Sequence, residues 1–305
     1  MSDVGDIQPD PNIIGNIAKP PFVQLPDPLR IFTKRAERLR SVSAGHELAA
    51  YLNFLADLTD VQLRVLPQLP EPDMPAAEVI ARAKEHGMPP LDRGGFKVDA
   101  AFDATLERLL SIVTTLEMPA TASEALGQFS ARSSEDRNAM IQNVLADSIP
   151  VETLAEHIFL AAALQVHFSR MAQRLDKDGL VAVGDGACPS CGAPPVTSVI
   201  VGWPGAVGSR FCSCSLCGTL WNFVRARCSV CGSTAKIAFQ EIEGSPGVIK
   251  AETCESCRTY VKVMYQQQNP ALDPVADDVA SLGLDLLVRE TGFRRGGVNP
   301  FLLGY

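Results

Sequence analysis

Two stretches of equal length decide the fold: CPSCGAPPVTSVIVGWPGAVGSRFCSCSLC at residues 188–217 and CSVCGSTAKIAFQEIEGSPGVIKAETCESC at residues 228–257. Each stretch begins and ends with a C-x-x-C pair, and 22 residues separate the two pairs. Adding 40 to the number of each paired cysteine in the first stretch gives its counterpart in the second. The repeat continues outside the cysteines, since Thr219 corresponds to Thr259. We therefore expect the two stretches to be structural copies of each other.

The C-x-x-C spacing is typical of metal ligands. One tight turn can point both sulfurs at the same centre, so two facing turns supply four thiolates at the corners of a tetrahedron. The economical assignment pairs the turns within each repeat and predicts two metal ions, in site 1 (Cys188, Cys191, Cys214, Cys217) and site 2 (Cys228, Cys231, Cys254, Cys257). A crossed arrangement, as in interleaved fingers, is the alternative. Four sulfurs suit zinc and mononuclear iron alike, so spacing does not identify the metal.

The residue after each turn also follows a pattern. Glycine takes this position at Gly192, Gly218 and Gly232, whereas Arg258 takes it in the fourth turn. Glycine permits positive φ and lets backbone N–H groups approach the sulfurs. The ninth cysteine, Cys212, has no C-x-x-C partner. It is either a spare ligand or reactive thiol, or a small buried hydrophobic residue, and the last case is the commoner one.

Helical patterns fill the chain before the cysteines. Apolar residues recur at helical spacing, and no strand pattern interrupts them, within 27–39, 48–63, 76–85, 102–113, 140–144 and 154–175. The composition then changes abruptly at Gly184-Asp185-Gly186, where glycine, proline, cysteine and β-branched residues replace the helix formers. We therefore expect a helical bundle that ends near residue 183.

Strand-like runs follow the second cysteine pair of each repeat, at residues 220–224 and 260–264. A helical pattern returns at Asp273, and this helix is too short to be stable alone, so we expect it to pack back onto the bundle or the metal modules. A glycine-rich tail, residues 292–305, is expected to be extended. The sequence thus predicts an α+β chain with an all-α N-terminal domain, two tandem four-cysteine ribbons and a C-terminal helix with its tail. The predicted bounds of these four parts are 1–183, 184–226, 227–268 and 269–305.

Composition and charge limit the function. The 305 residues carry a formal net charge of -8, which repels a phosphate backbone and disfavours a general nucleic-acid binder. The acidic start, Met1–Asp6, lacks the features of a secretory signal. The most apolar run, Ile158–Val166, is shorter than the roughly 20 residues that cross a bilayer, so it indicates a buried helix and no membrane span. Disulfides form in oxidising compartments, and no export signal to such a compartment is visible. We therefore expect a cytoplasmic protein whose cysteines bind metal or take part in redox chemistry.

The sequence shows no motif that would support enzymatic catalysis. His157 and His167 are ten residues apart, which is not a ligand spacing, and catalytic nucleophile or nucleotide-binding motifs do not stand at usable positions. We therefore predict that the protein is not an enzyme and has no catalytic residues. Residues 186–240 contain four basic residues and no acidic one: Arg210, Arg225, Arg227 and Lys236. This basic island could bind nucleic acid or an acidic partner, or offset the charge of the thiolates.

The chain resembles a known family in and around the cysteines. The resemblance rests on the following segments: Cys214–Trp221, Val224–Cys228, Lys250–Cys254, Pro20–Val23, Arg35–Leu39, Gly45-His46, Ala276–Leu282, Gly292-Phe293 and Asn299–Leu302. Together these segments span nearly the whole chain. They are similar to the landmarks of the formate dehydrogenase accessory (formation) protein family, FdhE.

The resemblance implies a function that the residues alone do not. It implies a cytoplasmic assembly factor that is required for the formation of active respiratory formate dehydrogenase. Such a factor binds the catalytic subunit of that enzyme before export and is not part of the final enzyme. The resemblance also implies rubredoxin-like modules, which favours iron over zinc at both sites. The alternatives are a rubredoxin-like electron-transfer or thiol-redox component and a zinc-ribbon protein that binds nucleic acid.

Overall fold

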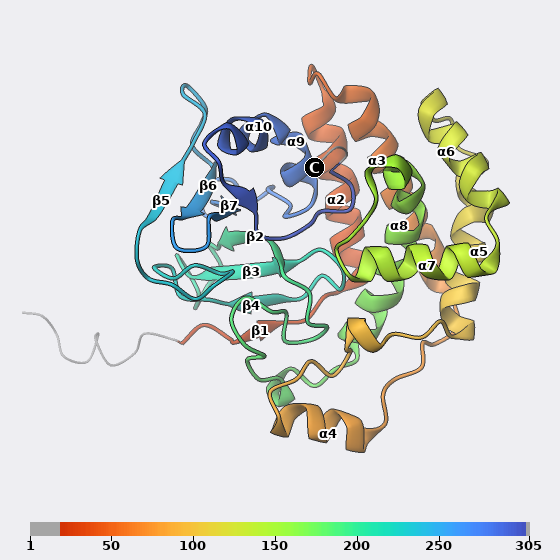
Figure 1. The fold of residues 1–305 in the computed structure, drawn as a ribbon, viewed down its shortest axis with the longest axis horizontal. Coiled ribbons are helices and arrows are strands. Elements are labelled where there is room, and N and C mark those ends of the chain that lie inside the picture. Colours follow the sequence, from red (N-terminus) through yellow and green to blue (C-terminus); the bar gives the residue numbers. More distant parts are fainter. Residues whose placement is uncertain (1–18, 303–305) are drawn as a thin grey trace, which may run out of the picture.

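A group of helices and one sheet form the two sides of the molecule, as the computed structural model shows for residues 19–302 (Figure 1). The acidic start, Met1–Asp6, and the end of the tail, residues 303–305, lie outside the described residues. The helices are α2 (Pro28–Ser43), α3 (Ala49–Val65), α4 (Ala77–Glu85), α5 (Ala100–Val113), α6 (Ala120–Ala131), α7 (Ser134–Leu145), α8 (Leu154–Gln173), α9 (Ala276–Ala280) and α10 (Leu282–Glu290). Short 3-10 turns lie at Leu66–Gln68, Arg93–Gly95, Val151–Thr153 and Lys177–Gly179.

Helix α8 is the centre of the helical region. Its residues are buried almost without interruption from Glu156 to Ala172, and it packs against α3, α5, α6 and α7. The consecutive alanines Ala161–Ala163 are fully or almost fully buried, which lets neighbouring helices approach closely. A helix that is apolar on every side is stable only when other elements cover all of it. The predicted buried helix is therefore confirmed.

Capping residues fix where two of these helices begin. The Asp27 carboxylate accepts a hydrogen bond from the Arg30 N–H at 3.4 Å, and Pro28 lies in the first turn of α2. The Asp99 carboxylate accepts from the Phe102 N–H at 2.6 Å at the start of α5. These side chains satisfy N–H groups that have no partner inside the helix. The helix start predicted at Asp27-Pro28 is confirmed.

The sheet contains both repeats. Its strand order is β1-β4-β3-β2-β7-β6-β5, and β8 pairs with β7 beside this path. The strands are β1 (Val23–Gln24), β2 (Pro195–Ile200), β3 (Arg210–Cys214), β4 (Leu220–Asn222), β5 (Ile237–Gln240), β6 (Ile249–Cys254), β7 (Thr259–Met264) and β8 (Arg294–Arg295).

The two repeats have the same strand arrangement and join to each other directly. Strands β2, β3 and β4 form an antiparallel unit, and β5, β6 and β7 form its counterpart 40 residues later. The join is a parallel pairing of β2 with β7, in which Thr197 lies opposite Lys262. The two ribbons are therefore halves of one continuous sheet.

One expectation about the N-terminal region is wrong. We expected no strand before residue 183, but β1 pairs antiparallel with β4, with Val23 opposite Trp221 and Gln24 opposite Leu220. A two-residue strand is too short to produce a recognisable alternation of apolar and polar residues. It forms because β4 would otherwise present an unpaired edge at this end of the sheet.

The C-terminal region differs in detail from the single helix and extended tail that we expected. Two short helices, α9 and α10, meet at Ser281; α9 packs against α2 and α3, and α10 contacts β6. Buried ion pairs fasten α2 to this region, with Arg35 Nε 3.3 Å from the Asp273 carboxylate and Arg38 2.7 Å from that of Asp277. Residues 292–302 of the tail pack against the molecule, since β8 pairs with β7 and Phe301 and Leu302 are buried.

Candidate metal centres

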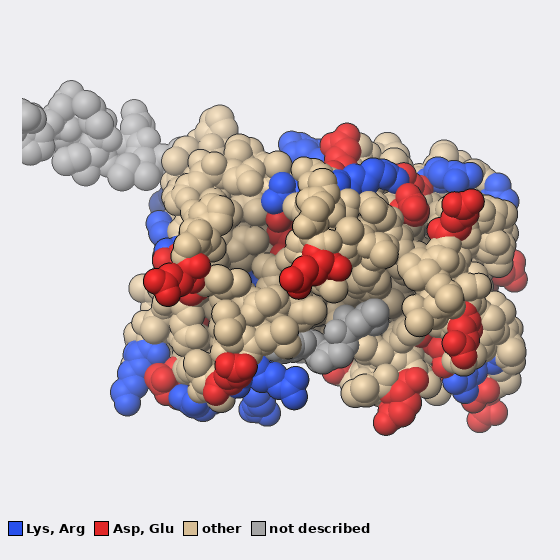
Figure 2. All heavy atoms as spheres, turned by 90° about the horizontal axis from the view of Figure 1, so that it is seen from above, with Lys and Arg blue, Asp and Glu red and all other residues tan. Residues whose placement is uncertain are grey.

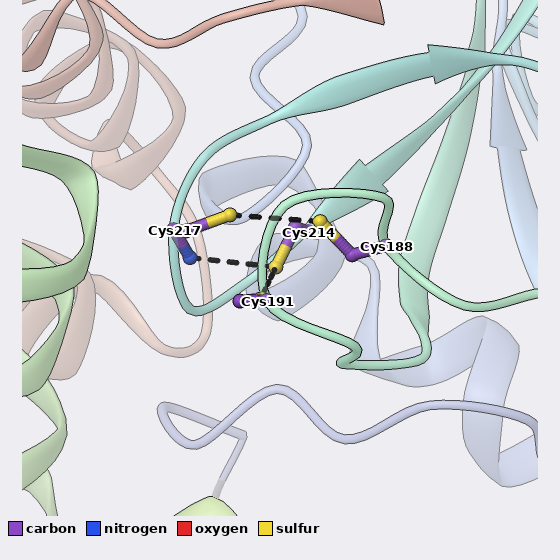
Figure 3. A group of neighbouring side chains, drawn as sticks. All are labelled: Cys188, Cys191, Cys214 and Cys217. Carbon is purple, nitrogen blue, oxygen red and sulfur yellow. Dashed lines mark hydrogen bonds between the residues drawn. The ribbon is translucent and has the colours of Figure 1, made fainter. Parts of the chain in front are cut away.

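The four sulfurs of site 1 lie close together (Figure 3). The Sγ atoms of Cys188 and Cys217 are 3.6 Å apart, and those of Cys191 and Cys214 are 3.5 Å apart. All four lie within 4.8 Å of one another. A metal–sulfur bond of about 2.3 Å in a tetrahedron requires sulfurs about 3.8 Å apart. The spacing in site 1 is therefore close to that of a four-sulfur metal centre.

Site 2 has the same arrangement. The Sγ atoms of Cys228 and Cys257 are 3.8 Å apart, and those of Cys231 and Cys254 are also 3.8 Å apart. These four sulfurs again lie within 4.8 Å of one another. The structure therefore brings together the cysteines of each repeat rather than those of a crossed arrangement.

Each C-x-x-C turn closes through the backbone of the residue that follows it. This residue has positive φ in all four turns: 80° at Gly192, 75° at Gly218, 72° at Gly232 and 57° at Arg258. In each turn its N–H donates to the carbonyl of the first cysteine, at 2.8, 3.2, 3.0 and 2.9 Å respectively. Three turns use glycine, which adopts this conformation without steric cost. Arg258 adopts it at a cost of roughly 1–2 kcal/mol.

Hydroxyl and N–H groups surround the sulfurs at equivalent places. Thr219 Oγ1 lies 3.2 Å from Cys217 Sγ in site 1, and Thr259 Oγ1 lies 2.9 Å from Cys257 Sγ in site 2. The Cys217 N–H donates to Cys214 Sγ at 3.3 Å. In site 1 the Thr219 hydroxyl accepts from Cys217 Sγ and donates to Ser190 Oγ at 2.9 Å. The N–H donor stabilises a thiolate and helps to orient it around a metal. The correspondence of Thr219 and Thr259 in the sequence thus reflects a hydroxyl held beside one sulfur of each site.

The helical region covers site 1. The Leu91 N–H donates to the Ser190 carbonyl at 2.9 Å, and the Arg93 N–H donates to the Cys191 carbonyl at 3.2 Å. From α8, Gln165 Nε2 donates to the Ser215 carbonyl at 2.8 Å. All four site 1 cysteines are at most 1% exposed and belong to the same hydrophobic core as the helices.

A charged pair lies next to site 1. Arg93 is 2.7 Å from the Asp147 carboxylate. Burial lowers the pKa of Arg93, but the hydrogen bond and charge of Asp147, with smaller effects of Cys191 and Cys214, raise it overall. A guanidinium in this position offsets part of the negative charge that four thiolates bring into the core.

Site 2 is more open. Cys231 is exposed and Cys257 is half-buried, while Cys228 and Cys254 are buried. Burial alone would raise the pKa of Cys254, but hydrogen bonds from the Cys257 and Ser256 N–H groups and from neighbouring thiols lower it to about 7. Thiolates therefore form readily at one corner of this site.

Comparison with known proteins decides the family. Residues 20–185 match "FdhE, N-terminal", residues 187–225 match "FdhE, central domain" and residues 226–302 match "FdhE, C-terminal domain". The chain belongs to the FdhE family. The resemblance found in the sequence is confirmed.

FdhE relatives match over almost their full lengths. The chain is 44% identical to an FdhE homologue of Rhizobium meliloti over 304 residues, which cover 99% of both chains. It is 35% identical to the homologue of Edwardsiella ictaluri, with 91% of this chain and 90% of the relative covered. The crystal structure of the FdhE protein from Pseudomonas aeruginosa superposes with a TM-score of 0.83 at 33% identity, covering 93% of this chain and 99% of that one.

Several other residues singled out in the sequence lie apart from the sites of this FdhE chain. Cys212 is buried on β3 outside both groups, and burial raises the pKa of its thiol to about 12. His157 Nδ1 donates to the Thr153 carbonyl at 2.7 Å, and His167 packs among Phe96 and neighbouring rings. Both histidines are buried, and burial lowers the pKa of each.

Part of the basic island is buried in this FdhE chain, and part lies at the surface. Arg210 is buried, and its guanidinium makes two hydrogen bonds of 2.9 Å to the Glu252 carboxylate. Arg227 lies 2.6 Å from the Asp185 carboxylate. On the face drawn in Figure 2, basic side chains lie among acidic ones. Arg210 and Arg227 thus pair with carboxylates 42 residues away in the sequence, whereas Arg225 and Lys236 are exposed.

Within residues 19–302 of this FdhE chain, we find no helix that combines the length and the apolar character needed to cross a membrane.

Proposed function

We propose that the chain is an accessory protein required for the formation of active respiratory formate dehydrogenase. It binds the catalytic subunit of that enzyme in the cytoplasm before export and does not become part of the final enzyme. The observation that carries this proposal is the pair of four-cysteine sites within a chain that matches FdhE relatives from end to end. The nine free cysteines agree with a reducing compartment.

Each site is proposed to hold one metal ion. The ligands are Cys188, Cys191, Cys214 and Cys217 at site 1, and Cys228, Cys231, Cys254 and Cys257 at site 2. Sulfur spacing, an N–H donor and a nearby guanidinium all fit a metal bound by thiolates. The family resemblance favours iron, and zinc is the alternative. A bound metal would supply folding free energy to the turns that hold it.

The proposed role is binding rather than catalysis. The histidines of the helical core are buried against carbonyl groups or aromatic rings, which leaves them no route to a substrate. We also propose the four parts 1–183, 184–226, 227–268 and 269–305 as the units of this binding protein. Limited proteolysis near residues 184, 227 and 269 tests that division.

A second candidate function is redox work at site 2, as in a rubredoxin-like component. The exposure of Cys231 favours it, because an exposed sulfur ligand brings a partner within reach of the metal. Visible absorption that bleaches reversibly on reduction would support this candidate, whereas colourless protein with two zinc ions would contradict it.

Co-purification tests the main proposal. The tagged chain, produced together with a formate dehydrogenase catalytic subunit, is expected to capture that subunit, and resin without the tagged chain serves as the control. Loss of the chain is expected to abolish formate dehydrogenase activity in cells. Absence of capture together with unchanged activity would contradict the proposal.

Charge reversal then locates the interface. Arg225 is exposed beside the first ribbon, and Arg30 is exposed on α2 of the helical region. If the sheet contacts the catalytic subunit, Arg225→Glu weakens capture of that subunit while Arg30→Glu does not. The reverse result would place the interface on the helices.

A further inference from the structure

The last nine described residues run from site 2 across the sheet to the helices, and we name them the C-terminal strap. The strap begins beside site 2. The Arg294 N–H donates to the Arg258 carbonyl at 3.0 Å, and the Gly296 N–H donates to the Tyr260 carbonyl at 2.8 Å. Arg258 directly follows Cys257, so the first bond of the strap attaches to the turn that closes site 2.

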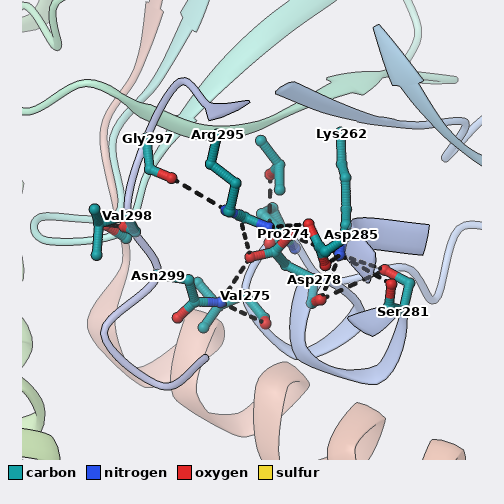
Figure 4. A network of polar contacts seen from close by, with 12 residues as sticks. Lys262, Pro274, Val275, Asp278, Ser281, Asp285, Arg295, Gly297, Val298 and Asn299 are labelled. Atoms are coloured by element: carbon teal, nitrogen blue, oxygen red, sulfur yellow. Dashed lines mark hydrogen bonds and ion pairs between the residues drawn. The ribbon is translucent and has the colours of Figure 1, made fainter. Parts of the chain in front are cut away.

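A buried ionic cluster holds the next part of the strap (Figure 4). Arg295 contacts the carboxylates of Asp278, at 2.7 Å, and Asp285. Lys262 of β7 contacts the same two carboxylates, and all four side chains are nearly or fully buried. Two cations thus balance two anions. Removing Arg295 from this cluster would leave two buried carboxylates with a single cation, which strongly opposes partial release of the strap.

The following residues of the strap reach site 1. Gly297 lies so close to the sheet that a Cβ atom there would stand 2.1 Å from the Pro195 carbonyl oxygen. The next residue, Val298, accepts a hydrogen bond through its carbonyl from Ser215 Oγ at 3.1 Å. Ser215 lies between the two cysteines of the second turn of site 1. The same short segment therefore contacts a turn of each site.

The strap ends on the helical region. Asn299 Nδ2 donates to the Val275 carbonyl at 3.2 Å and to the Asp278 carboxylate at 3.0 Å (Figure 4). The Tyr51 hydroxyl of α3 donates to the Phe301 carbonyl at 2.6 Å. Phe301 itself is buried in the core shared by the helices and site 1. Release of the strap would therefore loosen the contact between the helices and the sheet.

Site 2 is the place where release can start. Cys231 is exposed, so solvent, chelators and metal ions reach this site before they reach site 1. The turn at Cys254–Cys257 holds Arg258 at φ 57°, a conformation that a residue with a side chain adopts only under constraint. The Arg258 side chain adds a bond to the Thr291 carbonyl at 3.2 Å and lies over the Phe293 ring. A metal bound to Cys254 and Cys257 would hold the turn further, and its loss would free the Arg258 carbonyl to move away from the Arg294 N–H.

We propose that metal occupancy of site 2 controls the docking of the C-terminal strap, and through the strap the junction between site 1 and the helical region. This inference rests on the proposed binding of metal by the cysteines. Full occupancy fastens the strap, and loss of the site 2 metal releases it while site 1 stays filled. Through the strap, metal binding at the accessible site 2 thus controls the buried contact between site 1 and the helical region.

Hydrogen–deuterium exchange of the metal-loaded chain tests the proposal. In Cys231→Ser, metal analysis is expected to show about one ion per chain, and the strap amides should exchange at least ten-fold faster than in the wild type. Amides of α8 should keep their protection. The control is Ser256→Ala, an exposed residue inside a turn of site 2, which should keep both metal ions and a protected strap.

A reciprocal measurement avoids any cysteine substitution. Because coupling between two sites is reciprocal, a strap that docks poorly should release metal faster. Gly297→Val displaces the strap from Pro195, so transfer of the site 2 metal to a chromogenic chelator is expected to accelerate about ten-fold. The wild type treated briefly with chelator should lose strap protection and regain it when the metal is added back.

The outcomes separate the two proposals. If the wild type binds two metal ions and the strap amides of Cys231→Ser stay protected, the coupling is wrong and metal binding stands. If the wild type binds no metal, the proposed metal sites are wrong and the coupling fails with them. Should Cys231→Ser fail to fold, the chelator experiment on the wild type decides the question with the same amides.

Discussion

Site 1 and site 2 have the same local structure in different surroundings. Both use two turns with positive φ, a threonine hydroxyl beside one sulfur and four sulfurs within 4.8 Å of one another. Site 1, however, lies inside the core that the helices share, whereas Cys231 of site 2 faces solvent. The difference teaches that sequence spacing determines the geometry of such a site, while distant elements determine how firmly it holds its metal.

The largest expected effect comes from breaking site 1. Cys191→Ser should destabilise the whole chain, because a structural metal site contributes on the order of 10 kcal/mol of binding linked to folding, and this site lies in the common core. The matched variant Cys231→Ser should lower the main unfolding transition by less, because site 1 stays filled and the strap alone is released. Thermal unfolding followed by circular dichroism measures both. Equal losses of stability would show that the two sites are equivalent.

The link between the repeats should give the next largest effect. Arg210 of β3 and Glu252 of β6 form a buried ion pair across the two copies. Arg210→Met should cost about 3–5 kcal/mol, because it leaves a buried carboxylate without its cation. Chemical denaturation measures the loss. The double variant Arg210→Met with Glu252→Gln should recover part of it, and failure to recover any would show that the charge is not the cause.

A smaller effect should appear as a pH dependence of the stability of the helices that cover site 1. Burial lowers the pKa of His167, so the unfolded chain binds its proton first as the pH falls. The contribution of neutral His167 to stability is therefore full above about pH 6.5 and falls below it, by up to about 1.4 kcal/mol per pH unit. His167→Leu should make stability less dependent on pH between 6.5 and 5.5. An unchanged difference between variant and wild type across this range would contradict the assignment.

The smallest effect should follow substitution of the ninth cysteine. Cys212 occupies the position that Glu252 has in the second repeat, but it lies outside both groups of sulfurs. Cys212→Ala should lower stability by about 1 kcal/mol and keep two metal ions per chain. Metal analysis checks the second part. Loss of about half the metal would make Cys212 a ligand.

The sequence predicted which cysteines come together. A C-x-x-C turn is a short-range structure, so the four sulfurs of each group could be named from spacing alone. Arg258 was recognised as the exception among the four turns, and it is the non-glycine residue that adopts positive φ there. The helices with strong apolar periodicity, such as α8, were also found from the sequence.

Features that depend on distant residues were missed. The burial of site 1 comes from Leu91, Arg93 and Gln165, which belong to the helical half of the chain. The burial of Arg210 comes from a carboxylate 42 residues later, which a count of local charge does not reveal. Helix α6 was not predicted, because its alanine- and serine-rich sequence gives only a weak apolar stripe.

The parallel pairing of β2 with β7 joins the two repeats head to tail. In such a junction the first strand of one copy pairs with the third strand of the other, so a third-strand edge stays free at one end of the sheet and a first-strand edge at the other. β1 caps the free edge of the first copy at β4, whereas within residues 19–302 β5 has a strand neighbour on one side alone. A third copy of the unit could add its third strand, the counterpart of β4 and β7, to β5 without changing the existing junction between β2 and β7. The sheet therefore has the form of a duplication that is closed at one end and open to further growth at the other.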